Sequence, residues 1–266
     1  MKPVMKLNVH GSRGSIPTSS SSTVGYGGNT SCYELVFGNY QIFFDTGSGF
    51  RNANFLESSK SKIILYSHWH HDHIQGLPFN TGIFNPENRF LVSSALASRN
   101  VVRNTLQTYF SGGYFPVDII ENLSNFTYSN INSVKRSHAD DFELNWIELN
   151  HPGGCYGYSV VHGGKKFCYL CDNEYETSQL DALLKFADEA DLVIWDGMFT
   201  EAELETKRGW GHSSIEQGIF FSENCGHARV LISHHAPARL DNELHEIQKK
   251  LPDRVSLARD GLTLRL

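Results

Sequence analysis

Short runs of apolar residues, many of them β-branched or aromatic, alternate along the chain with clusters of Gly, Asn and Asp. Runs bounded by such turn-forming residues predict β-strands. The predicted strands cover residues 5–10, 31–37, 41–44, 62–67, 90–93, 143–149, 156–161, 166–170, 192–195, 230–233 and 256–266. Apolar residues at helical spacing predict four longer helices. These helices cover residues 95–110, 178–190, 213–224 and 240–251.

The order of these elements indicates the fold class. Strands dominate each half of the chain, and helices come between and after them. This order favours two mixed sheets packed face to face with helices outside, rather than one alternating parallel sheet. We therefore predict an α/β fold of the four-layer αβ/βα sandwich type, built from two similar halves. No linker-like segment interrupts the pattern, so we predict a single domain over residues 1–266.

The chain has 266 residues and five cysteines. Its N-terminus contains neither the apolar region of a signal peptide nor a membrane span. An odd number of cysteines in a chain of this size fits a reducing compartment, and we expect a cytoplasmic protein. Cys168 and Cys171 have CxxC spacing but fall in a predicted strand, where residues three apart point to opposite faces. This geometry disfavours a metal or redox role for the pair.

Charge narrows the range of partners. The net charge is −6, and no run of lysines or arginines occurs. Binding to duplex or transfer RNA normally needs a basic surface. A small anionic substrate, neutralised by bound metal, suits this chain better than a large nucleic acid.

Residues 79–118 are rich in aromatic side chains around the first predicted helix. Two interpretations stay open for them: burial in the core or in a homodimer contact, and a platform for substrate. The large area that each aromatic ring must bury favours the first interpretation.

A dense group of metal-ligating residues follows the fourth predicted strand. His68-Trp69-His70-His71-Asp72-His73 places four imidazoles and a carboxylate within six residues. Tracts of this composition usually bind metal, which disfavours a fortuitous His-rich surface loop. His68 and His70 can converge on one ion, while Asp72 and His73 can reach a second.

A site with two ions needs ligands from other parts of the chain. His151, Asp172 and His234 each come shortly after a predicted strand. In a sandwich such strand ends can gather at one edge. Each residue alone would more often be structural, but together they complete a set of seven ligands with Asp172 placed to bridge the ions.

The six-residue run from His68 to His73 matches the HxHxDH motif of the metallo-β-lactamase superfamily, which the chain resembles over nearly its whole length. The resemblance implies two divalent ions, with zinc expected first and manganese or iron accepted by the same ligand types. It also implies that Asp172 bridges the ions and that Asp45 orients the ligand loop without being a ligand. The implied ligands are His68, His70 and His151 for one ion and Asp72, His73 and His234 for the other.

Two further segments resemble the phosphodiesterases of that superfamily. Gly209-Trp210-Gly211-His212-Ser213-Ser214 resembles the His-Ser/Thr-Ser motif of ribonuclease Z and related enzymes, which lactamases lack. Asp196-Gly197-Met198-Phe199-Thr200 matches the acid-x-x-Tyr/Phe-Thr pattern that accompanies it. The resemblance implies that Asp196 keeps His212 charged and oriented to protonate the leaving oxygen, while Asp72 aims a metal-bridging hydroxide at phosphorus. The alternative for His212 is a structural histidine at a helix N-terminus.

His235 directly follows His234, and the His-His-x-Pro sequence resembles a subgroup of small cyclic-phosphodiesterase-like proteins. Two roles stay open for His235, namely contact with phosphate and support of the metal ligands.

The predicted function is a binuclear metal-dependent phosphodiesterase acting on small phosphodiesters such as cyclic nucleotides or ribose cyclic phosphates. The first alternative is a ribonuclease Z-like RNA processing enzyme, which would need a basic Gly-rich arm that the sequence lacks. The second alternative is a lactamase or a thioester hydrolase. The presence of Asp196 and His212, whose motif lactamases lack, disfavours this function. A non-catalytic ligand sensor is an alternative of another class, but such proteins tend to lose ligands and no ligand position is missing here.

Overall fold

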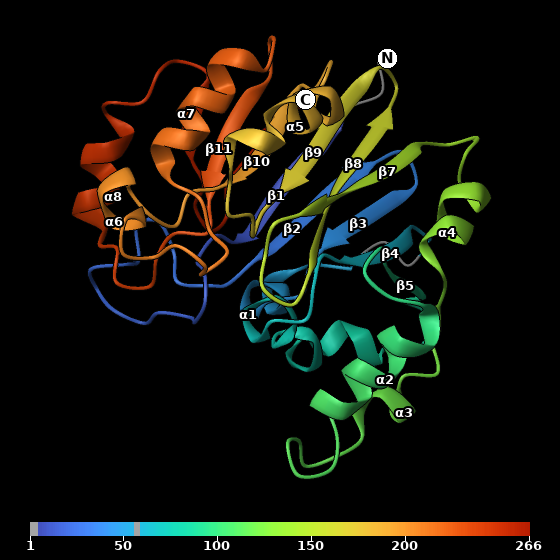
Figure 1. The fold of residues 1–266 in the computed structure, drawn as a ribbon. Coiled ribbons are helices and arrows are strands. Elements are labelled where there is room, and N and C mark those ends of the chain that lie inside the picture. The colour runs from blue at the N-terminus through green and yellow to red at the C-terminus, as the bar shows by residue number, and fades with distance from the viewer. Residues whose placement is uncertain (1–4, 56–58) are drawn as a thin grey trace.

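The computed structural model describes residues 5–55 and 59–266, and it contains two sheets packed face to face (Figure 1). The first sheet has the strand order β13-β1-β2-β3-β4-β5-β6. Its strands β13, β1, β2 and β3 pair antiparallel, and β3 to β6 pair parallel. The bounds are β1 Lys6–Gly11, β2 Cys32–Phe37, β3 Tyr40–Phe44, β4 Ser61–Tyr66, β5 Phe90–Ser94, β6 Phe126–Tyr128 and β13 Thr263–Arg265.

The second sheet repeats this mixed arrangement with the order β12-β11-β10-β9-β8-β7. Strands β7, β8 and β9 pair antiparallel, and β9 to β12 pair parallel. The bounds are β7 Glu143–Leu149, β8 Cys155–His162, β9 Lys165–Leu170, β10 Leu192–Asp196, β11 Arg229–Ser233 and β12 Val255–Leu257. The four parallel strands of each sheet have their carboxyl ends at the same edge of that sheet.

Apolar side chains from the facing surfaces of the two sheets form the central core. Leu35, Phe44 and Leu65 of the first sheet pack against Val160 and Tyr169 of the second. The rings of Phe44 and Tyr169 lie 5.4 Å apart between centroids. Because successive side chains of a strand point to opposite faces, the alternate residues are left to pack against the outer helices.

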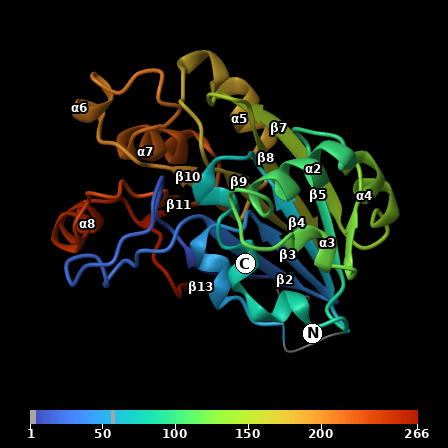
Figure 2. The same cartoon turned by 90° about the horizontal axis from the view of Figure 1, so that it is seen from below.

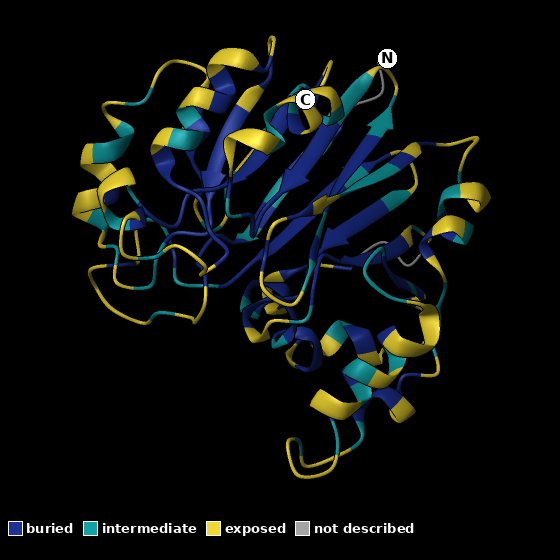
Figure 3. Cartoon of the chain, in the orientation of Figure 1, coloured by how far each residue is buried: buried dark blue, intermediate teal, exposed yellow. Residues whose placement is uncertain are grey.

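The helices cover the outer faces of the sandwich, and their outward surfaces are exposed (Figure 3). On the first sheet, α2 Arg99–Tyr109 and α3 Ile119–Asn122 contribute to the outer core. On the second sheet, α5 Leu180–Phe186, α7 Ile215–Asn224 and α8 Asp241–Gln248 do the same. The remaining short helices are α1 His71–Ile74, α4 Ile131–Ser137, α6 Glu201–Leu204, η1 Ser48–Asn52, η2 Leu77–Phe79, η3 Thr81–Phe84 and η4 Thr177–Gln179. The predicted four-layer αβ/βα sandwich is confirmed.

The predicted strand 256–266 was wrong as a single element. It forms two strands in different sheets, β12 paired with β11 and β13 paired with β1. The turn between them contains Gly261 in the left-handed region, with φ +80°. The Asp260-Gly261 pair is a local turn signal that the prediction of one continuous strand overlooked.

Other differences concern short elements. Strand β6 and helix α4 were not predicted, and α2 begins only at Arg99 because Ser98 has an extended backbone with ψ 159°. Cys168 and Cys171 do lie on opposite faces, one in the outer core and one between the sheets. No helix within the two described parts of the chain is long and apolar enough to cross a bilayer.

The aromatic residues predicted for core or dimer contact divide between burial and exposure. Phe110 is buried beneath α2, whereas Tyr114 is 80% exposed and Phe79 is 63% exposed. A dimer contact at the exposed rings stays a prediction.

Candidate metal centre

The predicted ligands meet at the edge of the sandwich to which the parallel strands point, seen from below in Figure 2. The loop after β4 carries His68 and His70 and leads into α1, which carries Asp72 and His73. From the second sheet, His151 follows β7, Asp172 follows β9 and His234 follows β11. The contiguous loop from one sheet therefore faces separate strand ends of the other.

One group consists of His68, His70, His151 and Asp172, whose ligand atoms all lie within 4.8 Å of one another. His151 Nε2 lies 2.9 Å from His70 Nδ1 and 3.7 Å from Asp172 Oδ2. His68 Nε2 is also 3.7 Å from Asp172 Oδ2. His70 is exposed while the other three are buried, so the group opens to solvent on the His70 side.

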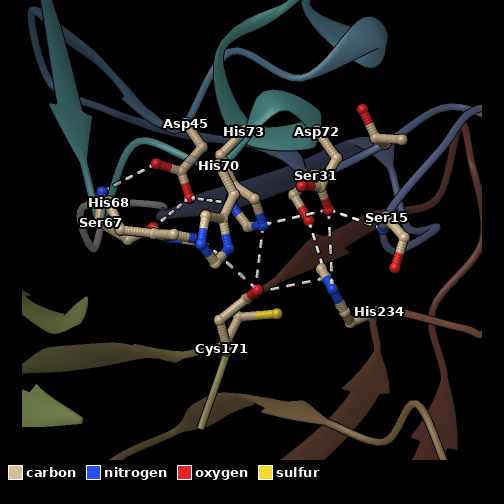
Figure 4. Close-up of polar contacts among 12 residues, drawn as sticks. Ser15, Ser31, Asp45, Ser67, His68, His70, Asp72, His73, Cys171 and His234 are labelled. Carbon is tan, nitrogen blue, oxygen red and sulfur yellow. Dashed lines mark hydrogen bonds and ion pairs between the residues drawn. The ribbon is translucent and has the colours of Figure 1, made fainter. Parts of the chain in front are cut away.

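The second group consists of Asp72, His73 and His234 (Figure 4). Asp172 lies beside it. His73 Nε2 lies 3.4 Å from Asp72 Oδ2 and 3.2 Å from Asp172 Oδ1. His234 Nε2 is 3.7 Å from Asp72 Oδ2, and its Nδ1 is 3.3 Å from Asp172 Oδ1. One oxygen of Asp172 thus faces each group.

The donor atoms of this cluster fit bound cations. Four buried atoms have no hydrogen-bond partner, namely the Nε2 atoms of His68, His73 and His234 and Oδ1 of Asp172. Leaving buried polar atoms unpaired costs about 1–3 kcal/mol each, so their convergence on one place requires another explanation. Burial lowers the pKa of His68 well below its usual value, which favours the neutral ring that binds metal. Imidazole nitrogens and carboxylate oxygens are the ligands of zinc and related divalent ions.

The Asp45 carboxylate forms hydrogen bonds with Ser67 and His73, at the two ends of the segment that carries the predicted ligands (Figure 4). Its Oδ2 lies 2.8 Å from His73 Nδ1 and accepts hydrogen bonds from the hydroxyls of Ser67 and Tyr169. Its Oδ1 accepts the backbone N–H of Ser67 at 2.8 Å. With His73 Nδ1 paired to a carboxylate, His73 Nε2 is the nitrogen left to face the cluster.

Backbone strain is concentrated here. Among the described residues, the non-glycine positions with positive φ are Ser15, Asp45, Asp172, Glu189 and His234, with φ between 59° and 63°. All but Glu189 belong to the cluster or contact it. Such conformations cost about 1–3 kcal/mol each and persist where surrounding contacts enforce them. The tight turns at these strand ends are what direct the ligand side chains toward one another.

Asp196 and His212 form a hydrogen-bonded pair beside the ligands. His212 Nδ1 lies 2.8 Å from Asp196 Oδ2, and the two Asp196 oxygens also accept the backbone N–H groups of Asn173 and Met198. The His212 ring stacks on His234 with a centroid separation of 4.9 Å. Burial opposes the charged imidazolium, but Asp196 outweighs it and raises the pKa of His212 to about 9. The pair therefore favours a protonated histidine at the margin of the cluster.

His235 points away from the cluster. It is 1% exposed, and its Nε2 lies 2.8 Å from the carbonyl oxygen of Ala258. Tyr26 packs edge-on against its ring. Of the two roles left open for His235, this placement accords with support of the neighbouring ligand rather than with contact to phosphate.

The sequence did not single out several residues that contact the cluster. Ser15 donates its backbone N–H to Asp72 Oδ2 at 2.7 Å, and Ser31 Oγ lies 3.1 Å from His234 Nδ1. Gly14 packs against His234 so closely that a Cβ there would lie 2.4 Å from the ring. Gly14 and Ser15 lie within residues 12–30, whose Ser- and Gly-rich composition predicts a flexible loop, and Ser31 begins the predicted strand 31–37. Neither pattern indicates contacts with the cluster.

The family model that matches the chain, its ribonuclease Z relatives and the two His/Asp groups together indicate the class of the protein, a metal-dependent hydrolase. The chain belongs to the β-lactamase superfamily, because the family model described as the beta-lactamase superfamily domain matches residues 40–235. The superfamily inferred from the HxHxDH motif is therefore confirmed.

Comparisons with individual proteins agree with that assignment. The chain is 21% identical to ribonuclease Z of Haloarcula marismortui, with 98% of this chain and 97% of the relative covered. Its fold is similar to that of the metallo-β-lactamase fold protein YhfI from Bacillus subtilis, with a TM-score of 0.72, 19% identity and full coverage of both chains. A diphosphatase of the PhnP family also has a TM-score of 0.72, with 19% identity and 98% of each chain covered.

Proposed function

We propose that the protein is a binuclear metal-dependent phosphodiesterase that acts on small phosphodiesters, such as cyclic nucleotides or ribose cyclic phosphates. The observation that carries the proposal is the Asp196–His212 pair, joined at 2.8 Å and stacked on His234. A hydrolase that expels an alkoxide from phosphorus uses a proton donor close to the leaving oxygen. The similarity to a ribonuclease Z and to a PhnP-family diphosphatase supports hydrolysis at phosphorus.

Two divalent ions, with zinc expected first, would be held by the two His/Asp groups with Asp172 between them. When bound, such ions stabilise the negative charge of the phosphate and activate water near neutral pH. Three residues of the chain orient these side chains. Asp45 contacts His73, and Ser15 contacts Asp72. Ser31 contacts His234.

The protein side chains position the attacking water and supply a proton to the leaving oxygen. Asp72 accepts a hydrogen bond from the attacking water and aims it at phosphorus, while Ser15 holds the carboxylate in place. His212 has its Nδ1 paired with Asp196, so its Nε2 is left to donate a proton to the leaving oxygen. The substrate enters from the His70 side, where the cluster is exposed.

A ribonuclease Z-like activity on precursor transfer RNA is the second candidate. The named relative spans nearly the whole chain, which favours it. The net charge of −6 argues for smaller substrates, because binding of structured RNA relies on lysine and arginine contacts to phosphate.

The test is a parallel assay of the metal-loaded protein on bis(p-nitrophenyl) phosphate, 2′,3′-cyclic AMP, a ribose cyclic phosphate, precursor transfer RNA, a β-lactam and a glutathione thioester. We expect turnover of the small phosphodiesters. Hydrolysis of the β-lactam or the thioester without any phosphodiester cleavage would overturn the proposal. A metal-replete protein inactive on all six compounds would favour the non-catalytic sensor.

A matched pair of histidine variants tests the proton donor. His212→Ala should lower kcat on phosphodiesters about 10²- to 10⁴-fold, the usual contribution of a general acid, with metal content unchanged. His227→Ala, an exposed histidine after α7, serves as the control and should retain full activity. A His212→Ala enzyme with normal kcat would remove His212 from the mechanism.

A further inference from the structure

An exposed tryptophan stands two residues before His212. Trp210 is 58% exposed, and Lys207 Nζ lies 4.3 Å from the centre of its ring. A large aromatic side chain left this accessible forgoes the favourable burial that indoles normally obtain. Exposed aromatic rings beside a cation are typical of surfaces that bind ligands.

The loop that carries Trp210 is tied to the metal centre. The Glu174 carboxylate accepts the backbone N–H groups of both Gly209 and Gly211, at 2.8–2.9 Å. The carbonyl oxygen of Gly211 lies 2.7 Å from His151 Nδ1. These contacts hold the residues on both sides of Trp210, so the position of the indole is coupled to that of a predicted ligand.

The two glycines are required by this geometry. Gly209 and Gly211 have φ of +83° and +84°, where an L side chain would be strained. A Cβ at Gly211 would lie 2.3 Å from His151 Nδ1, too close for any real side chain. The backbone thus passes directly over the His151 ring at Gly211, the residue that follows Trp210.

The short separation between Trp210 and His212 is comparable to the size of a nucleotide. Two residues span at most about 7 Å, so the backbone of Trp210 lies within that distance of His212. A phosphodiester held at His212 is therefore close to the backbone of Trp210, and Lys207 Nζ lies beside the indole. Single-stranded nucleic acid binding uses such pairs, since every base has a face on which an indole can stack.

We propose that Trp210, with Lys207, forms a stacking site for the nucleobase of the substrate, and that the enzyme acts on nucleotide phosphodiesters in preference to base-free sugar phosphates. This inference rests on the proposed phosphodiesterase function and specifies its substrate class. Trp210 determines specificity and takes no part in proton transfer. Glu174 is a positioning residue that holds the loop.

The kinetic test compares substrates with and without a base. For Trp210→Ala we expect KM for 2′,3′-cyclic AMP to rise about ten- to a hundredfold, the contribution of one stacked base. Its kcat should stay within about threefold, and both constants for a ribose cyclic phosphate should be unchanged. Trp210→Phe should recover most of the affinity, because phenylalanine retains a stacking face. Phe220→Ala, which removes another exposed aromatic ring on α7, is the control.

Equal effects of Trp210→Ala on both substrates, or no effect on either, would overturn the stacking site. If the wild-type enzyme cleaves phosphodiesters in that case, the proposed function stands and the inference alone fails.

A binding measurement separates the two proposals when activity is absent. AMP should quench the tryptophan fluorescence of the wild-type protein, and the quenching should disappear in Trp210→Ala while the remaining tryptophans are intact. Quenching at Trp210 in a protein without phosphodiesterase activity would support the nucleotide site and refute the proposed function. Quenching that persists in the variant would contradict the site.

Discussion

The two sheets contribute to the metal centre in different ways. The first sheet supplies four of the predicted ligands from one contiguous segment, the loop after β4 and helix α1. The second sheet supplies His151, Asp172 and His234 from three separate strand ends, together with the Asp196–His212 pair. The contrast suggests a division of labour, in which the first sheet provides a compact metal-binding loop and the second completes the site and sets its chemistry.

The largest effect should come from Asp172, the second-sheet residue that faces both groups. Asp172→Asn should release both ions and lower kcat/KM at least about 10⁴-fold, because each ion contributes several kcal/mol to the transition state. Metal content by atomic emission and turnover on bis(p-nitrophenyl) phosphate are the measurements. Asp181→Asn, at an exposed position of α5, is the control. Retention of two ions with turnover within tenfold of wild type would refute the central position of Asp172.

A first-sheet carboxylate should have a more local effect. Asp72→Ala should abolish detectable turnover, a loss of at least about a thousandfold, since the variant lacks both a ligand and the acceptor for the attacking water. The group of His68, His70 and His151 is untouched, so one ion should remain bound. Near-normal activity of Asp72→Ala, or loss of both ions, would break the predicted separation of the two groups.

Asp45 tests how far the first sheet preorganises its loop. Asp45→Asn weakens the hydrogen bond to His73 Nδ1 while keeping the side-chain shape. We expect a 10- to 100-fold loss in metal affinity or activity, as is usual for the partners of metal ligands. Metal titration followed by a chelator tests this expectation. Full affinity in the variant would mean that packing alone orients His73.

The sequence predicts those features of the fold and site that depend on residues close together in the chain. His68 to His73 form a contiguous motif, and the second-sheet ligands could be placed because each follows a strand whose carboxyl end faces the same edge. Asp196 and His212 were identified only by resemblance to known motifs. The contact of Ser15 could not be predicted, because it is made by a backbone N–H in a turn with positive φ. The contact of Ser31 depends on the position of His234, which also has a positive φ. The turn that moves residues 256–266 from one sheet to the other does have a local signal, Asp260-Gly261, which the prediction of a single strand overlooked.

The smallest effect is expected at another His–carboxylate pair, His10 with Glu34, on the first sheet away from the metal centre. Its Nε2–Oε2 distance of 2.9 Å is close to that of the Asp196–His212 pair. Burial opposes ionisation of Glu34, but hydrogen bonds from His10, Asn8 and Gln41 prevail and lower its pKa. The lowered pKa stabilises the fold above the unfolded value of about 4.3, and this stabilisation is lost as pH falls through the folded value.

Glu34→Gln should therefore lower the free energy of unfolding at neutral pH by about 1 kcal/mol and flatten its decline below about pH 5. Urea unfolding at several pH values measures both changes, and turnover at pH 7 should not change. Loss of turnover in a folded Glu34→Gln protein would show that this pair acts on the metal centre.

The most direct test of the account is a crystal structure of the metal-loaded protein with anomalous scattering recorded at the absorption edge of the bound metal. We predict two anomalous peaks, one among His68, His70 and His151 and the other among Asp72, His73 and His234, with an oxygen of Asp172 contacting each. A single peak, or two peaks without Asp172 between them, would contradict a binuclear centre assembled jointly by the two sheets.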